Sequence, residues 1–131
     1  MLKEKVEKAL NSQIKKEAYS SNLYLAMAVW AETSGLEGTA QWLYAQAEEE
    51  TMHMLKFVHY INERGGKAII PALDQPPAKW KDVFVLFEEV LKHEEYISES
   101  INELVAITVK EKDFSTNNWL QWFVTEQIEE E

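Results

Sequence analysis

The chain has 131 residues, a formal net charge of -10 and a pI near 4.8. So acidic a chain is poorly suited to nucleic acid or anionic membranes, and it favours cations or basic partners. Cysteine is absent, which excludes disulfides and thiolate ligands and leaves oxygen and imidazole as the only strong metal ligands. The length predicts one domain over residues 1–131, and the lack of cysteine indicates a cytoplasmic protein.

The sequence offers no signal for secretion or for crossing a membrane. Residues 1–7 are typical of a charged helix start, and the longest apolar run, 23–31, is too short to span a bilayer.

Two long helices are predicted in the first half of the chain. Apolar residues recur at helical spacing over about residues 3–33, and Ser34 and Gly35 end that pattern. A second helix follows over about 37–64 and is closed by the glycine pair 65–66. Because the link is only two or three residues long, the two helices should be antiparallel neighbours.

A long connector separates this hairpin from a second one. Residues 65–79 contain all three prolines and should be extended, so they can run the length of a thirty-residue helix. The helix after the connector, from residue 79 or 80 to 110, can then run parallel to the one before it. A fourth helix begins at the capping residues 113–116 and continues to the chain end. The expected fold is an all-α four-helix bundle with one long crossover.

Glu50 and His53 are the central candidate site residues. They are three residues apart, so they point the same way on a helix and can share one metal ion. Glu50 also lies in an apolar stripe and is therefore expected on the buried face, where a carboxylate needs a partner or a cation. A solvated acidic patch is the alternative, and it fits Glu48 better than Glu50. The stripe consists of Leu43, Ala47, Met54, Phe57 and Ile61.

Three further carboxylates are expected at the same height in the bundle. Glu17 and His53 each lie about eighteen residues from the first turn, and Glu94 and Glu130 lie about eighteen residues from the second. Glu17 and Glu94 interrupt otherwise apolar faces, although Glu17 could also lie at the edge of its stripe.

An internal repeat supports the pairing of the two hairpins. A shift of 77 residues places Glu17 on Glu94 and Trp42 on Trp119. The same shift places Glu50 on Gln127 and His53 on Glu130. Two helical hairpins related by a pseudo-two-fold axis, each supplying half of one site, account for this pattern.

Four carboxylates converging in one bundle strongly favour a di-metal site. Their mutual repulsion and desolvation cost many kcal/mol, and two divalent cations would cancel their charge. A set of oxygens with one imidazole and no sulfur suits Fe²⁺ or Mn²⁺ better than structural zinc. Calcium is disfavoured because a helical core offers few carbonyl ligands.

Several segments together closely resemble prokaryotic non-haem ferritins over all 131 residues. They are residues 36–40, 46–50, 76–77, 93–95, 111–113 and 122–127. Ferritin-like di-metal proteins carry a Glu on two helices and Glu-x-x-His on the other two, a known arrangement that the second hairpin departs from. The resemblance implies a ferroxidase that oxidises Fe²⁺ with O₂ or H₂O₂ and stores ferric mineral in a homo-oligomeric cage of 24 subunits.

The resemblance also implies ligand roles. One iron would be held by Glu17, Glu50 and His53. The second would be held by Glu50 as a bridge, with Glu94 and Glu130, and Gln127 would lie close by.

Further roles follow from the same resemblance. Glu49, Glu126 and Glu129 match the outer residues of a third iron site that shares Glu130. Tyr24 matches a tyrosine that can donate electrons, and an ordinary core tyrosine is the alternative. Trp122 could likewise be redox-active, but packing is the favoured role for it and for Trp30, Trp42 and Trp119.

Other functions fit the sequence less well. Rubrerythrins and bacterioferritins resemble a symmetric pattern with histidine where this chain has Glu130. Haem is not expected, since Met52 is typical core filler, and His59 and His93 should simply be exposed. A non-storage di-iron oxidase and a metal-free helical scaffold remain alternatives. The fourth helix is expected to be short, because the sequence stops at residue 131 where family chains continue. Either the sequence is a fragment, or this protein does without the parts that follow.

Overall fold

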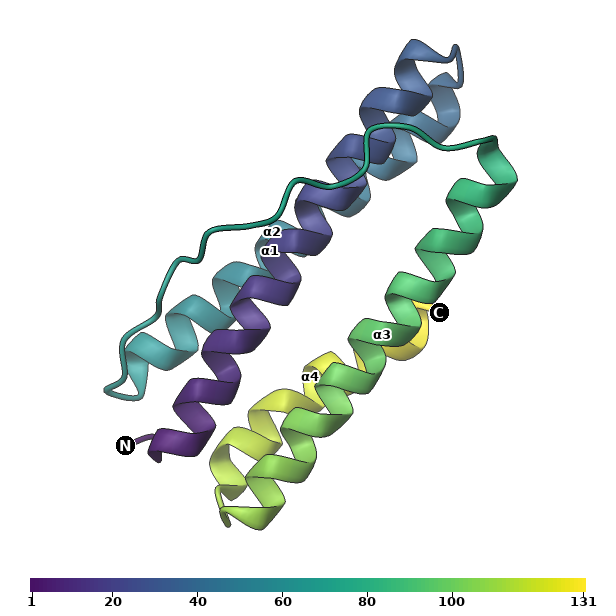
Figure 1. Ribbon diagram of the computed structural model, residues 1–131. Coiled ribbons are helices and arrows are strands. Elements are labelled where there is room, and N and C mark those ends of the chain that lie inside the picture. Colours follow the sequence, from purple (N-terminus) through teal and green to yellow (C-terminus); the bar gives the residue numbers. More distant parts are fainter.

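The computed structural model describes residues 1–131 as four α-helices without a strand, so the predicted all-α bundle is confirmed. Helices α1 (Glu4–Thr33) and α2 (Glu37–Glu63) form one antiparallel hairpin. Helices α3 (Val83–Lys110) and α4 (Phe114–Glu130) form the other. The extended connector runs back along the first hairpin, so that α3 runs parallel to α2 (Figure 1). Helix α4 ends about half-way along α3.

The turns form where the sequence predicts them. Gly35 and Gly65 have φ angles of +81° and +86°, a left-handed conformation that glycine adopts without steric cost. Asp113 caps α4, because its side chain accepts hydrogen bonds from the backbone N–H of Thr116 at 3.0 Å and from its hydroxyl at 2.6 Å. These stops fix the length of each helix and therefore the height of the residues within it.

Helix α3 begins later than predicted, at Val83 rather than at residue 79 or 80. Asp82 is the N-cap, and its side chain accepts a hydrogen bond from the backbone N–H of Val85 at 2.9 Å. Trp80 lies outside the helix, buried edge-on against Trp30 with ring centroids 6.1 Å apart. The predicted start is too early because Trp80 continues the apolar pattern of the helix. Periodicity alone does not distinguish a buried connector residue from a helical one.

The buried face of α3 includes Leu86 rather than its neighbour Phe87. Leu86 is fully buried, whereas Phe87 is 40% exposed and packs against Trp42 of α2 with ring centroids 5.8 Å apart. Positions 86 and 90 are a helical turn apart, so the buried stripe passes through Leu86 and Val90.

The apolar core is divided into two clusters of 11 residues each. One, around Leu10, Phe57 and Leu120, lies toward the turn between α3 and α4. The other, around Met27, Leu43 and Leu86, lies toward the turn between α1 and α2. The buried carboxylates Glu17, Glu50 and Glu94 belong to neither cluster, and they lie between the two in the chain order of α1, α2 and α3. The core is thus interrupted by one polar layer.

Aromatic rings fill the space between α2 and α4. The Cα atoms of these two helices are nowhere within 8 Å of each other, whereas α1 approaches both α2 and α3. Trp119 stacks on Tyr60 with centroids 4.1 Å apart, and Phe57 lies 4.4 Å from Phe123. Large side chains therefore hold α2 and α4 apart and leave room in the polar layer.

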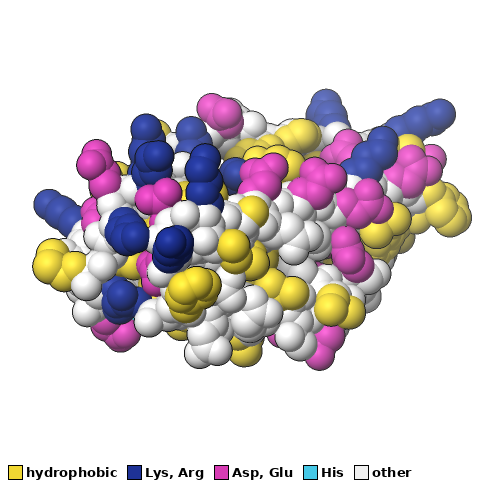
Figure 2. Space-filling view, turned by 90° about the horizontal axis from the view of Figure 1, so that it is seen from below, with side chains coloured by type: hydrophobic (Ala, Val, Ile, Leu, Met, Phe, Trp, Pro, Cys, Tyr) yellow, Lys and Arg dark blue, Asp and Glu magenta, His cyan; other side chains and the backbone are white.

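The surface mixes charged and apolar side chains. In Figure 2, which views the bundle from below, Lys and Arg side chains lie at the left and along the upper right edge, and carboxylates and apolar side chains are interspersed with them on both sides. None of the four helices combines the length and the hydrophobicity that crossing a bilayer requires.

Candidate metal centre

The polar layer brings together the carboxylates that the sequence placed at one height. Glu17 on α1, Glu50 on α2 and Glu94 on α3 are 0%, 1% and 2% exposed, and His53 is 4% exposed. Glu130, in the last turn of α4, is partly buried beside them. The alternative predictions, Glu17 at the edge of its stripe and Glu50 in a solvated patch, are therefore wrong.

Glu17, Glu50 and His53 form the first cluster of ligand atoms, which lie within 4.8 Å of one another. The Nδ1 atom of His53 is 3.4 Å from Oε2 of Glu50 and 4.0 Å from Oε2 of Glu17. These three atoms, with Oε1 of Glu50, are buried and accept or donate no hydrogen bond. Buried polar atoms without partners are costly, so their convergence on one point indicates a missing ligand.

The second cluster consists of Glu50, Glu94 and Glu130, again within 4.8 Å. Glu50 belongs to both clusters, which is the position of a bridging carboxylate. Glu94 accepts a hydrogen bond from the Tyr24 hydroxyl and another from Nε2 of Gln127 at 3.2 Å. Gln127 also contacts the backbone oxygen of Glu94 at 3.4 Å, so it orients this side chain.

Crowding and burial hold these carboxyls in their neutral form when no cation is present. Burial raises the pKa of Glu50 to about 8 and that of Glu94 to about 7. Burial, followed by the charge of Glu50, raises the pKa of Glu17 well above its ordinary value. Burial also raises the pKa of Glu130 and, with the neighbouring Glu94 charge, that of Tyr24. A divalent cation would favour the ionised forms, so protons and cations compete for this layer.

The donor set fits small divalent transition metals. Ligand atoms held at about 2.1 Å from one ion lie about 3–4.2 Å apart, depending on the angle between them. The separations of 3.4 and 4.0 Å around His53 fall in that range. Five side chains offer only oxygen and imidazole nitrogen, which suits Fe²⁺ or Mn²⁺. Glu17, Glu50 and His53 would hold one ion, and Glu50, Glu94 and Glu130 would hold a second.

A third acidic cluster lies beside the first two and contains Glu49, Glu126 and Glu130. Glu49 is exposed and Glu126 is half-buried, so this cluster faces solvent. Glu129 is exposed and lies outside the cluster, and its assignment as a ligand stays a prediction.

A groove of about 260 Å³ leads from this outer cluster to His53. Its lining residues are Glu49, Met52, His53, Lys56, Trp122 and Glu126. The Trp122 ring lies edge-on to His53 with centroids 5.5 Å apart, and the Lys56 ammonium lies 3.2 Å from the centre of the Trp122 ring. Met52, the residue weighed for haem, is 57% exposed.

His93 is not simply exposed, as the sequence suggested. It is partly buried between α1 and α3, where its Nε2 atom lies 2.6 Å from the Ser20 hydroxyl. Its ring is perpendicular to that of Tyr24 with centroids 6.0 Å apart, and burial lowers the pKa of His93 to about 4. His59 is exposed as predicted.

Two amides that hold the ligand carboxylates were missed at the sequence level. Gln13, which is 1% exposed, donates a hydrogen bond to Oε1 of Glu17 at 3.3 Å. Gln46 donates to Oε2 of Glu130 at 2.8 Å from the neighbouring helix. Gln13 could have been recognised, because it is one helical turn before Glu17 on the same buried face. Gln46 could not, because its contact depends on the distance between α2 and α4.

The relatives of the chain agree with this geometry. Residues 7–131 match the family model described as a ferritin-like domain. A probable bacterial non-heme ferritin-like protein of Haemophilus influenzae is 48% identical over all 131 residues, which cover 79% of its length. The chain belongs to the ferritin family. Within that family, the bacterial non-heme ferritin of Campylobacter jejuni is 43% identical, again over the whole chain and 78% of the relative.

Solved ferritin structures superpose closely on this ferritin chain. An open pore ferritin from Archaeoglobus fulgidus matches with a TM-score of 0.97 and 43% identity, covering 99% of this chain and 80% of that one. A ferritin of Chlorobium tepidum matches with a TM-score of 0.96 and 45% identity, covering 99% and 79%. The predicted resemblance to non-haem ferritins is therefore confirmed.

Proposed function

We propose that this ferritin chain stores and detoxifies iron, and that it oxidises Fe²⁺ at a di-iron centre within the polar layer of one subunit. The observation that carries the proposal is the set of buried, unpartnered atoms of Glu17, Glu50 and His53 beside Glu94 and Glu130. Family membership supports iron as the cargo.

The proposed reaction uses two Fe²⁺ ions as substrates. Each ion gives up one electron, and O₂ takes both electrons with two protons to form H₂O₂, leaving two Fe³⁺ for storage. Peroxide can serve as the alternative oxidant. In that case H₂O₂ accepts two electrons and two protons to give two water molecules. Bound iron supplies the redox chemistry, and the chain supplies ligands, orientation and a water-poor layer.

The residues have distinct roles in this proposal. Glu50 bridges the two ions, His53 and Glu17 complete the first site, and Glu94 and Glu130 complete the second. Gln127 orients Glu94 and lies close to the second iron. The ligands must lose their protons as iron binds, and the raised pKa values of Glu50 and Glu94 make binding weaker at low pH.

The outer residues of the proposal act before or after oxidation. Glu49, Glu126 and Glu130 would hold a third, transient iron at the mouth of the groove, with Glu129 nearby. Tyr24 is a candidate electron donor, because Glu94 already accepts its hydrogen bond and can take its proton.

Storage requires assembly, which we propose as a homo-oligomeric cage of 24 subunits in the cytoplasm. The likeness to an open pore ferritin supports assembly, and the chain also exposes several large apolar side chains that subunit interfaces would cover. Val29, Ile69, Ile70 and Phe84 are 52%, 62%, 69% and 77% exposed.

The test combines oxidation with particle mass. Purified protein should bind two Fe²⁺ per chain without air, oxidise them when air is admitted, and then accumulate many more iron atoms per particle while staying soluble. Light scattering should show one large, uniform particle. Oxidation without accumulation, in a monomer or dimer, would instead identify a non-storage oxidase. If the protein neither binds nor oxidises Fe²⁺, the proposed function is wrong.

A further inference from the structure

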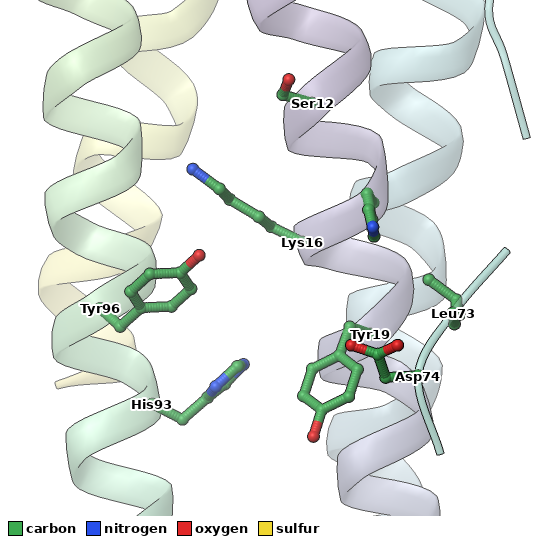
Figure 3. A pocket seen from close by; sticks show the side chains of 8 residues that line it. Ser12, Lys16, Tyr19, Leu73, Asp74, His93 and Tyr96 are labelled. Carbon is green, nitrogen blue, oxygen red and sulfur yellow. The ribbon is translucent and has the colours of Figure 1, made fainter. Parts of the chain in front are cut away.

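A second polar site lies between α1, α3 and the connector, on the side of the bundle where His93 reaches the surface (Figure 3). It is an open pocket of about 480 Å³, within the range of about 300–1,000 Å³ that is typical of small-molecule sites. Its lining residues are Ser12, Lys15, Lys16, Tyr19, Leu73, Asp74, His93 and Tyr96. None of them is a candidate ligand of the metal centre.

Two lysines and one carboxylate, Asp74, line this pocket, so its lining carries a net positive charge in an acidic chain. No carboxylate lies within 4.0 Å of the Lys15 or Lys16 ammonium group, as is true of every lysine and arginine in the chain. Lys16 extends from α1 toward α3 in Figure 3, and its ammonium lies 5.6 Å from the centre of the Tyr96 ring. Free ammonium groups over a concave surface favour a negatively charged ligand.

Aromatic rings form the walls and His93 forms the floor. The His93 ring lies 6.0 Å from Tyr96 on α3 and 6.2 Å from Tyr19 on α1, measured between centroids. Tyr96 is 49% exposed, so its ring is accessible to a ligand. Flat rings on two helices with a gap between them are suited to a planar, aromatic guest.

One hydrogen-bond acceptor of His93, at the floor of the pocket, has no partner within the protein. The Ser20 hydroxyl donates its single proton to the backbone oxygen of Lys16 at 2.9 Å, so it accepts a hydrogen bond from Nε2–H of His93 at 2.6 Å. The neutral ring then carries a lone pair on Nδ1. That atom has no protein partner and is not sealed from solvent. A ligand that donates a hydrogen bond to it would complete the arrangement.

We propose that this pocket binds a small aromatic anion of the hydroxybenzoate type. Its carboxylate would pair with Lys15 and Lys16, its ring would lie against Tyr96 and Tyr19, and a hydroxyl at the opposite end would donate to Nδ1 of His93. The proposal is independent of the proposed iron chemistry, because it uses none of the metal-binding side chains.

The test is a titration of the purified, assembled protein, prepared free of iron, with 4-hydroxybenzoate at low salt. Binding is measured by calorimetry and by ligand-observed NMR. Two further compounds test the two polar contacts separately: benzoate lacks the hydroxyl donor, and phenol lacks the negative charge. We expect 4-hydroxybenzoate to bind once per chain, and both other probes to bind at least about fivefold more weakly.

Matched variants locate the site. Lys15→Gln/Lys16→Gln should weaken binding about tenfold, since charge-assisted hydrogen bonds are about twice as strong as neutral ones. Tyr96→Ala should weaken it severalfold. Lys79→Gln/Lys81→Gln removes the same charge from exposed connector residues outside the pocket and should leave the Kd unchanged.

Three results would overturn the proposal. One is no binding of 4-hydroxybenzoate up to millimolar concentration. Another is an equal loss of affinity in the two lysine pairs, which would indicate only the general field of the protein. The third is displacement by inorganic phosphate with benzoate and 4-hydroxybenzoate equal, which would indicate a site for any anion. None of these outcomes depends on whether the protein oxidises iron.

Discussion

The two hairpins contribute opposite kinds of half-site to one polar layer. In the first hairpin, Glu17, Glu50 and His53 present four buried atoms without a hydrogen-bond partner. In the second, Glu94 accepts hydrogen bonds from Tyr24 and Gln127, and Glu130 accepts one from Gln46. The two halves are related by the 77-residue repeat, but they differ in how many of their polar atoms have a hydrogen-bond partner within the protein.

One part of the difference lies in a substitution within the repeat. Gln127 occupies the position that corresponds to Glu50, and its amide donates a hydrogen bond where a carboxylate would repel. The second half-site is therefore tolerable without a cation, whereas the first is costly. We infer that the first ion binds to Glu17, Glu50 and His53, and that the second binds more weakly. The following experiments challenge that order.

Glu50→Ala should have the largest effect, because Glu50 is the only residue in both inner clusters. The initial rate of Fe²⁺ oxidation should fall at least about 100-fold, since both ions lose a ligand and their relative position. Stopped-flow absorbance measures this rate. Glu48→Ala, an exposed neighbour with the same charge, is the control and should oxidise iron at the normal rate. Equal rates in the two variants would refute the assignment.

His53→Ala and Gln127→Ala should separate the two half-sites. Loss of the His53 ligand should abolish the tight binding step, so that anaerobic titration counts one Fe²⁺ per chain in place of two. Loss of Gln127 removes an orienting partner of Glu94 and should weaken only the second step, by about 10–100-fold. Calorimetry resolves both steps. If Gln127→Ala weakened the tighter step instead, the order of binding proposed here would be reversed.

The pH dependence of stability should reveal how much the buried carboxylates destabilise the metal-free protein. The folded-state pKa values of Glu50 and Glu94, about 8 and about 7, lie above their ordinary value of 4.5. Between these values the folded state holds more protons than the unfolded state, so stability is highest below about pH 4.5 and falls as the pH rises to about 8.

The Tm of metal-free protein should therefore decrease from pH 5 to pH 8, and Glu50→Gln, which cannot ionise, should flatten that decrease. Divalent cation should raise the Tm most at the upper end of the range, because ligand protons compete with it. A Tm that increases with pH in the metal-free protein would contradict the account.

The smallest effect is expected from the hydroxyl of Tyr24. Tyr24→Phe removes the hydrogen bond to Glu94 and should destabilise the metal-free protein by about 1–3 kcal/mol, the cost of leaving a buried polar group unpaired. Urea unfolding measures the change. Tyr44→Phe removes a hydroxyl that bonds Glu32 on the surface, and it should change stability by less than about 0.5 kcal/mol.

The sequence was sufficient for the helices and for the buried carboxylates of the polar layer. Carboxylates at positions 17, 50 and 94 interrupt apolar stripes, and a buried charge must have a partner, so periodicity and electrostatics together located the polar layer. Counting residues from the two turns placed Glu130 at the same height, because the rise per residue of a helix is constant.

Contacts set by the distance and rotation of neighbouring helices could not be predicted. Gln46 reaches Glu130, and His93 reaches Ser20, only because of how the helices pack. The start of α3 was also misplaced, because Asp82 ends the connector with a local hydrogen bond while Trp80 continues the apolar pattern. Periodicity identifies the buried face of a helix, but not which side chains of the neighbouring helices contact that face.

Anomalous diffraction from crystals soaked anaerobically in Fe²⁺ would locate the bound iron itself. Two iron peaks per chain are expected on either side of Glu50, one beside Glu17 and His53 and the other beside Glu94 and Glu130, with the first filling at lower iron concentration. Iron found only at Glu49 and Glu126 on the surface, or no iron in the polar layer, would contradict the proposed di-iron centre.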